Sequence, residues 1–282
     1  MNKLSIEKRA RVIASLVEGN SIRSTVRMTG VAKGTVTRLL VDVGNACADF
    51  HGRTVRNVSA ERVQCDEIWS FVGMKKKNVP VEKRRTFGVG DVWTWTALDA
   101  DSKLMISWLV GDREIDCATA FMKDLASRLA KRVQLTTDGY GHYVHATEEA
   151  FGADVDFAQL IKVFRADPGA EARYSPPRFI RIEEIQRAGN PDPDHISTSF
   201  VERQNLTMRM SMRLFTRLTN GFSKKVENHA AAIALHFVHY NFARIHQTLR
   251  VTPAMAAGLS DHAWTVEEIV GLLASDRMLL TA

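Results

Sequence analysis

The hydrophobic positions near the start of the chain repeat at the spacing of an α-helix. They predict a first helix over residues 4–17, and Ser21 and Gly30 then mark the start and the end of a short second helix. A third helix is expected over residues 32–46. Short helices joined by a glycine-containing turn are typical of a helix-turn-helix, although a purely structural helical cap has the same pattern. The residues that would face the DNA major groove at the start of the third helix are Lys33, Thr35, Thr37 and Arg38.

After residues 51–60, which lack periodicity and are interpreted as a linker, the pattern changes to that of strands alternating with helices. The β-rich segments carry β-branched and aromatic residues, and the helical segments have apolar residues at helical spacing. This order predicts an α/β fold, a mixed sheet with helices packed against it. The expected elements are strands over 62–73, 87–98 and 103–111, a helix over 114–130, a strand ending at Asp138, a helix over 143–152 and a strand over 155–164.

The segment 165–198 is predicted to be irregular, because it holds five of the seven prolines of the chain. A loop of this length inside a compact domain is usually functional. Helical periodicity then returns, first from Ser199 to about Asn220 and again from Lys224 to about Phe242.

Charge is distributed unevenly along the chain, whose net charge is +6. Residues 1–40 carry a net charge of +6 and residues 203–250 a net charge of +7. All other residues together therefore carry a net charge of −7. Basic elements around an acidic module suit a protein that binds a polyanion and concentrates carboxylates for chemistry. The three cysteines, Cys47, Cys65 and Cys117, are far apart and are expected to be buried thiols of a cytoplasmic protein. No apolar run is long enough to span a bilayer.

Three carboxylates occupy positions where α/β proteins place their active sites. Asp66 lies in the first strand, Asp138 at the carboxyl end of a later strand, and Glu202 near the start of a helix. Hard divalent cations such as Mg²⁺ prefer oxygen ligands, and a pair of such ions can drive displacement at a phosphodiester. From residue types alone each acid is also explained as a turn or capping residue.

Several segments in this order resemble the DDE transposases of bacterial insertion sequences, most closely the insertion-sequence-one type. The resemblance covers nearly the whole chain and is carried by the motifs VQCDEIWSFVG, DVWTWTALDADSKLMISWLVGDR, LTTDGY, STSFVERQNLTMRMSMRLFTRLTN and HYNFARIHQTLRVTPAMAAG. It implies a ribonuclease-H-like core in which Asp66, Asp138 and Glu202 are the catalytic, metal-binding triad. The gap between Asp138 and Glu202 is longer than is usual in the family, and the 165–198 segment accounts for the excess.

The resemblance also implies an activity. Two Mg²⁺ ions, for which Mn²⁺ can substitute, would support hydrolysis at a transposon end and attack of the freed 3′-OH on target DNA. The partners would be double-stranded DNA, as terminal inverted repeats and as target, and further copies of the chain in a dimer or larger assembly. The expected domains are a helix-turn-helix domain at 1–50, the linker at 51–60, the catalytic domain at 61–220 and a helical region at 221–282.

The motif STSFVERQN at 197–205 has two interpretations. Ser199 and Glu202 have the spacing of a capping box, in which the glutamate bonds back to a backbone amide. A continuous helix would instead place Glu202 on one face with Arg209 and Arg213, which favours a metal ligand beside phosphate-binding arginines. Two other functions remain open, a DNA-binding regulator without catalysis and a ribonuclease-H-like nuclease without strand transfer.

Overall fold

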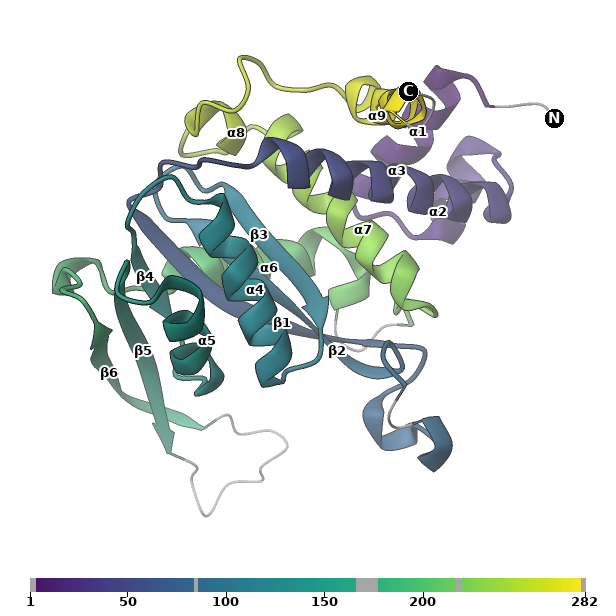
Figure 1. Ribbon diagram of the computed structural model, residues 1–282. Helices are drawn as coiled ribbons and strands as arrows, with labels where there is room; N and C mark the ends of the chain where they lie inside the picture. Colours follow the sequence, from purple (N-terminus) through teal and green to yellow (C-terminus); the bar gives the residue numbers. More distant parts are fainter. Residues whose placement is uncertain (1–3, 84–85, 166–176, 217–219, 280–282) are drawn as a thin grey trace.

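The computed structural model describes residues 4–83, 86–165, 177–216 and 220–279. Its centre is a mixed six-stranded sheet with the strand order β3-β2-β1-β4-β5-β6 (Figure 1). The pairs β1–β2, β2–β3 and β5–β6 are antiparallel, whereas β4 is parallel to both β1 and β5. The strands are β1 (Arg62–Val72), β2 (Gly90–Asp99), β3 (Met105–Gly111), β4 (Gln134–Thr137), β5 (Asp156–Arg165) and β6 (Arg178–Ala188).

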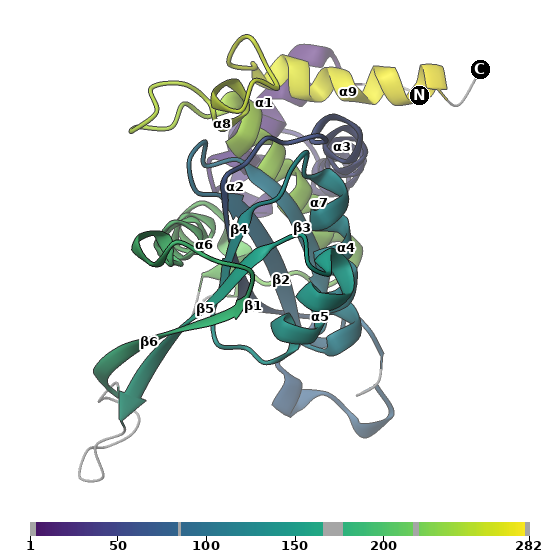
Figure 2. The same ribbon diagram turned by 60° about the vertical axis from the view of Figure 1, so that its left-hand side comes forward.

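Helices cover both faces of the sheet. Helices α4 and α5 lie on one face and α6 on the other (Figure 2). The predicted α/β class and the mixed sheet are therefore confirmed. The helices are α1 (Ile6–Val17), α2 (Ile22–Thr29), α3 (Lys33–Thr54), α4 (Ile115–Arg128), α5 (His142–Phe151), α6 (Ser199–Ser211), α7 (Val226–Val238), α8 (Pro253–Ala256) and α9 (Val266–Leu279).

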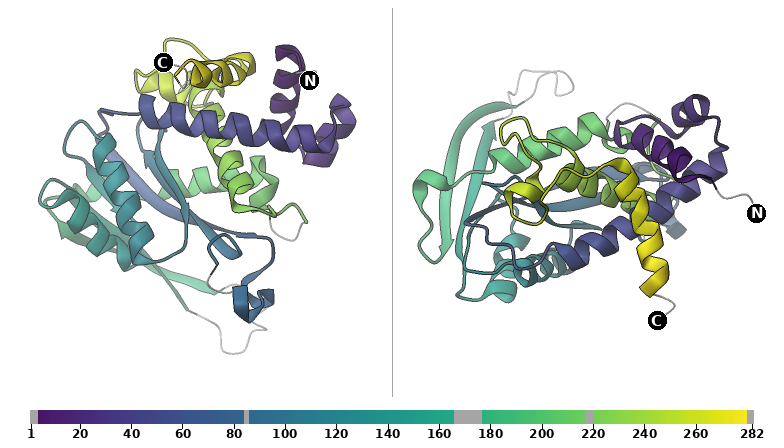
Figure 3. Two further views of the ribbon diagram at one scale, coloured as in Figure 1. Left: turned by 45° about the vertical axis from the view of Figure 1, so that its right-hand side comes forward. Right: turned by 90° about the horizontal axis from the view of Figure 1, so that it is seen from above.

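The first and last helices of the chain pack together above the sheet (Figure 3). Helices α3 and α7 also pack against one another, so closely that a Cβ added at Gly44 of α3 would lie 2.3 Å from the carbonyl oxygen of Ala231 in α7. Ser21 caps α2 through the Ser24 amide, and Gly30 ends it with a left-handed φ of 69°, as the sequence predicted. Cys47 and Cys65 are buried in the main hydrophobic core, also as predicted.

Three of the elements expected from the sequence differ in the structure. The linker was expected to begin at residue 51, but α3 continues to Thr54 because His51 is buried and binds the Met105 carbonyl oxygen at 3.0 Å. The segment 165–198 contains strand β6, which pairs with β5; the prolines that suggested a loop flank this strand. Residues 166–176 of that segment lie outside the described residues.

The third difference concerns the helix that follows Ser199. It was expected to reach about Asn220, yet α6 ends at Ser211 and Met212 takes an extended conformation. The extended residue allows Met212 and Phe215 to enter a second hydrophobic core, which lies between α6 and the sheet. Among the described residues no helix is long and apolar enough to cross a membrane.

Candidate active site at the end of strand β4

Alternation along β1 directs two sets of side chains to opposite faces of the sheet. Gln64, Asp66 and Ile68 face α6. Gln64 binds a backbone amide of that helix, Asp66 binds Asn205, and Ile68 belongs to the core beneath the helix. Val63 and Cys65 belong to the main core, and Glu67 bonds to Tyr143 of α5. The face that carries Asp66 is therefore the face on which α6 lies.

Gln64 fixes the start of α6. Its Oε1 accepts hydrogen bonds from the amides of Phe200 at 2.9 Å and Val201 at 3.1 Å, which are first-turn amides without partners in the helix. The predicted cap, Ser199, is instead the first helical residue, and Thr198 takes the N-cap position without a side-chain bond to the backbone. A side chain from β1 thus replaces the local capping box and ties α6 to the strand that carries Asp66.

Asp138 reaches Asp66 because β4 is short. The last β1–β4 pair is Cys65 with Thr137, so β1 has no β4 residue beside it from Asp66 onward. The chain turns there, and the Asp138 carboxylate accepts a bond from the Tyr140 amide at 3.0 Å. Oxygens of Asp66, Glu67 and Asp138 all lie within 4.8 Å of one another.

Burial and neighbouring carboxylates raise the pKa values of Asp66 and Asp138. Burial, together with Glu67 and Asp138, raises the pKa of Asp66 to about 7, against the opposing effect of bonds from the Glu67 amide and Asn205. Burial also raises the pKa of Asp138, and the charge of Glu202 adds to the rise. Like charges held together in a partly dry site are a situation that a bound cation would relieve.

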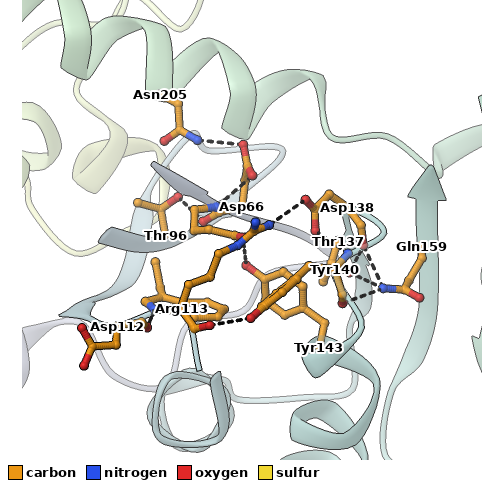
Figure 4. A network of polar contacts seen from close by, with 12 residues as sticks. Asp66, Thr96, Asp112, Arg113, Thr137, Asp138, Tyr140, Tyr143, Gln159 and Asn205 are labelled. Atoms are coloured by element: carbon orange, nitrogen blue, oxygen red, sulfur yellow. Dashed lines mark hydrogen bonds and ion pairs between the residues drawn. The ribbon is translucent and has the colours of Figure 1, made fainter. Parts of the chain in front are cut away.

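Arg113 already supplies one positive charge to this group (Figure 4). Its guanidinium lies 2.5 Å from Glu67 Oε1 and 4.0 Å from Asp138 Oδ2. The aromatic rings of Trp93 and Tyr140 pack against it, with centroids 4.7 Å and 4.0 Å from Cζ. Glu67 points to the face of β1 opposite Asp66, but its carboxylate joins the group beyond the end of β4, where no β4 residue lies beside β1.

Replacing Arg113 by Met is expected to lower the free energy of unfolding by about 2–4 kcal/mol, because it removes the partner of a buried charge. The Glu67 side chain is only 1% exposed and would keep only the Tyr143 hydroxyl, at 2.9 Å. Urea denaturation at pH 7 measures the loss. The matched control is Arg181→Met, whose pair with Glu183 is at the surface and is worth less than about 1 kcal/mol. Equal losses in both variants would contradict the role given to Arg113.

Glu202 projects from the first turn of α6 but is not a member of the close carboxylate group. Its two oxygens lie 2.5 Å from Lys162 Nζ, and one of them accepts a bond from the Thr198 hydroxyl at 2.6 Å. Asn205, on the same helix, donates to Asp66 Oδ2 at 2.8 Å. The structure thus brings Asp66 and Asp138 together and places Glu202 beside them on α6.

The residues expected to bind DNA lie at two places. Lys33, Thr35 and Arg38 are exposed on the first turns of α3, and Thr37 is half-buried with its hydroxyl bonded to the Lys33 carbonyl at 3.0 Å. Arg209 lies on α6. Arg213 was expected on the same helix face, but it follows the extended Met212 and lies in a separate 3₁₀ turn.

Comparison with known proteins finds similar chains among the solved structures, two transposases among them. No family model and no curated protein matches the chain. A piggyBac transposase in a synaptic complex with hairpin DNA aligns over 100% of this chain and 74% of its own, at 11% identity and a TM-score of 0.45. The Mos1 transposase in its strand transfer complex aligns over 83% and 78%, at 13% identity and a TM-score of 0.23. Because the sequence identities and TM-scores are this low, any assignment of function depends on the residues of this chain.

Several residues of the site were not predicted from the sequence. Gln64, Arg113 and Lys162 act on partners distant in the sequence, so no local spacing marks them. Glu67 had one signal, since it adjoins Asp66 in a strand otherwise made mainly of apolar residues, and a buried acid there requires a partner.

Proposed function

We propose that this protein is a DDE-type DNA transposase that cuts at the ends of a DNA element and joins them to target DNA. The observation that carries the proposal is the meeting of Asp66 and Asp138, which are far apart in the sequence, within one carboxylate group beside the helix that bears Glu202. These are the acids that the resemblance to insertion-sequence transposases assigns to catalysis.

The strand order supports the ribonuclease-H-like core that the same resemblance implies. An antiparallel β1–β2–β3 meander adjoins the parallel strands β4 and β5, and Asp66 and Asp138 lie on neighbouring strands. Ligand sites of open α/β sheets lie outside the carboxyl ends of strands, where Asp138 is found. In this proposal β6 and the residues before α6 are an insertion into that core.

The donor set fits Mg²⁺. It consists of carboxylate oxygens and is partly buried, and the pKa of Asp66 is raised by burial and by the neighbouring charges of Glu67 and Asp138. Asp66 and Asp138 would hold the metal, with Glu202 completing the set. Two bound ions would activate the attacking oxygen and stabilise the leaving one during in-line displacement.

The residues around the acids prepare the site. Asn205 orients the Asp66 carboxylate, and the Tyr140 amide together with the Gln159 side chain fixes the Asp138 turn. Arg113 offsets the charge of Glu67, so that this buried acid does not add a full negative charge to the site. These contacts hold the carboxylates in place before the substrate arrives.

DNA would be bound by the basic elements at both ends of the chain. We propose that α2 and α3 form the helix-turn-helix, with Lys33, Thr35, Thr37 and Arg38 reading the terminal repeat. Arg209 and Arg213 would contact phosphates near the cut. Cutting two ends together requires a dimer or larger assembly on the DNA, acting in the bacterial cytoplasm.

Labelled terminal repeats, a supercoiled target plasmid and Mg²⁺ test the function. The proposal expects joined products that disappear with EDTA. Cleavage without joining would favour a nuclease, and binding without either reaction, under conditions where a control transposase works, would favour a DNA-binding regulator.

A further inference from the structure

The ammonium group of Lys162 holds the Glu202 carboxylate through both oxygens at 2.5 Å. The Thr198 hydroxyl adds a bond to the same carboxylate. Meanwhile Glu202 is not one of the acids whose oxygens lie within 4.8 Å of one another. The third acid of the proposed site is therefore engaged by a lysine of the protein itself.

Lys162 stands on the part of β5 that extends beyond the end of β4. The last β4–β5 pair joins Thr137 to Gln159, and the Gln159 side chain donates to the Asp138 carbonyl at 2.8 Å. Ile161 packs against the Asp138–Gly139 turn so closely that a Cβ on Gly139 would lie 2.9 Å from it. The strand that supports the Asp138 turn thus also presents Lys162 to Glu202.

The ion pair is suited to exchange rather than to permanent stabilisation. The side chains of Lys162 and Glu202 are 37% and 42% exposed. An exposed pair of this kind contributes little to stability, because water screens it and two long side chains must be ordered. A phosphate can compete for the ammonium group, and a divalent cation can compete for the carboxylate.

We propose that Lys162 is a substrate-released latch on Glu202. In the DNA-free protein it holds the carboxylate; when DNA enters, a phosphate beside the reacting position takes the ammonium group and leaves Glu202 to the metal. Lys162 then binds substrate phosphate. This inference rests on the proposed function, since it requires a nucleic-acid substrate and a metal at the acids.

The variant Lys162→Met tests the latch, because it keeps the length of the side chain and removes the charge. Mn²⁺ binding to the DNA-free protein, measured by isothermal titration calorimetry, is expected to become about two- to fivefold tighter, since the competing ammonium is gone. The kcat/KM for Mg²⁺-dependent DNA cleavage is expected to fall about 10- to 100-fold, since a charge-assisted phosphate contact is lost. Lys162→Arg keeps the charge and is expected to retain cleavage.

The matched control is Arg181→Met on the adjacent strand β6, which removes an exposed cation paired with Glu183. This control should change neither the Mn²⁺ affinity nor the kcat/KM for DNA cleavage. If the wild type cleaves DNA but Lys162→Met leaves either Mn²⁺ affinity or cleavage at the wild-type value, the latch is refuted. If the wild type neither binds Mn²⁺ at these acids nor cleaves DNA, the proposed function fails first. Melting temperatures show that each variant is folded.

Discussion

Replacing Asp66 by Asn is expected to reduce Mg²⁺-dependent DNA cleavage by at least about 10³-fold, because it removes a charged oxygen ligand from the centre of the carboxylate group. Neighbouring bonds can persist: the Glu67 amide can still donate to the new side chain, and the Asn205 amide can turn to accept from it. Gel analysis of cleavage products with labelled DNA ends measures the loss. Wild-type cleavage by the variant would contradict the metal-binding role.

The same variant is expected to be more stable than the wild type when metal is absent and the pH is high. The carboxyl pKa is raised from the usual 3.8 to about 7 in the fold, so the unfolded chain loses its proton first as pH rises. In the wild type, the charged Asp66 carboxylate therefore destabilises the folded state. This destabilisation is absent near pH 4, grows between pH 4 and 7, and is complete above 7. Thermal melts in EDTA should therefore show a stabilisation by Asp66→Asn that grows over this range. A difference in melting temperature between Asp66→Asn and the wild type that does not change with pH would contradict this prediction.

Replacing Glu202 by Gln is expected to abolish cleavage to a similar degree, about 10³-fold, while the fold keeps its stability to within about 1 kcal/mol. The α6 amides are capped by Gln64, so the helix does not depend on Glu202 for its start. The lost pair with Lys162 is half-exposed and weak. Cleavage assays and urea denaturation of the same preparation measure both quantities.

The matched control for Glu202→Gln is Glu183→Gln on β6, which also removes the acid of an exposed ion pair. It should leave cleavage unchanged. A fully active Glu202→Gln protein would return Glu202 to a local structural role, and an inactive Glu183→Gln protein would show that charge loss in this region acts through the fold.

The strands and the two aspartates could be predicted because their signals are local. Alternation in β1 gives the faces of Asp66 and Glu67, and the short, mostly buried strand β4 places Asp138 at its end. Strand β6 escaped prediction because it lies at the sheet edge with mostly exposed residues, so burial leaves no alternating pattern in its sequence.

The contacts that complete the site could not be predicted, because they join distant segments. Helical periodicity continues beyond Ser211, yet α6 ends there since Met212 and Phe215 gain burial in the core beneath it. Nothing near Ser199 reveals that Gln64 caps the helix. Likewise Lys162 and Arg113 meet their acids only once β5 and the loop after β3 are folded against the site.

The most direct test of the central claim is a crystal of the protein grown with Mn²⁺ and examined by anomalous scattering. The account predicts an ion within roughly 2.2 Å of oxygens of both Asp66 and Asp138, and its loss in Asp66→Asn. A protein saturated with Mn²⁺ that holds no ion between these two carboxylates, or holds it equally well in Asp66→Asn, would contradict the account.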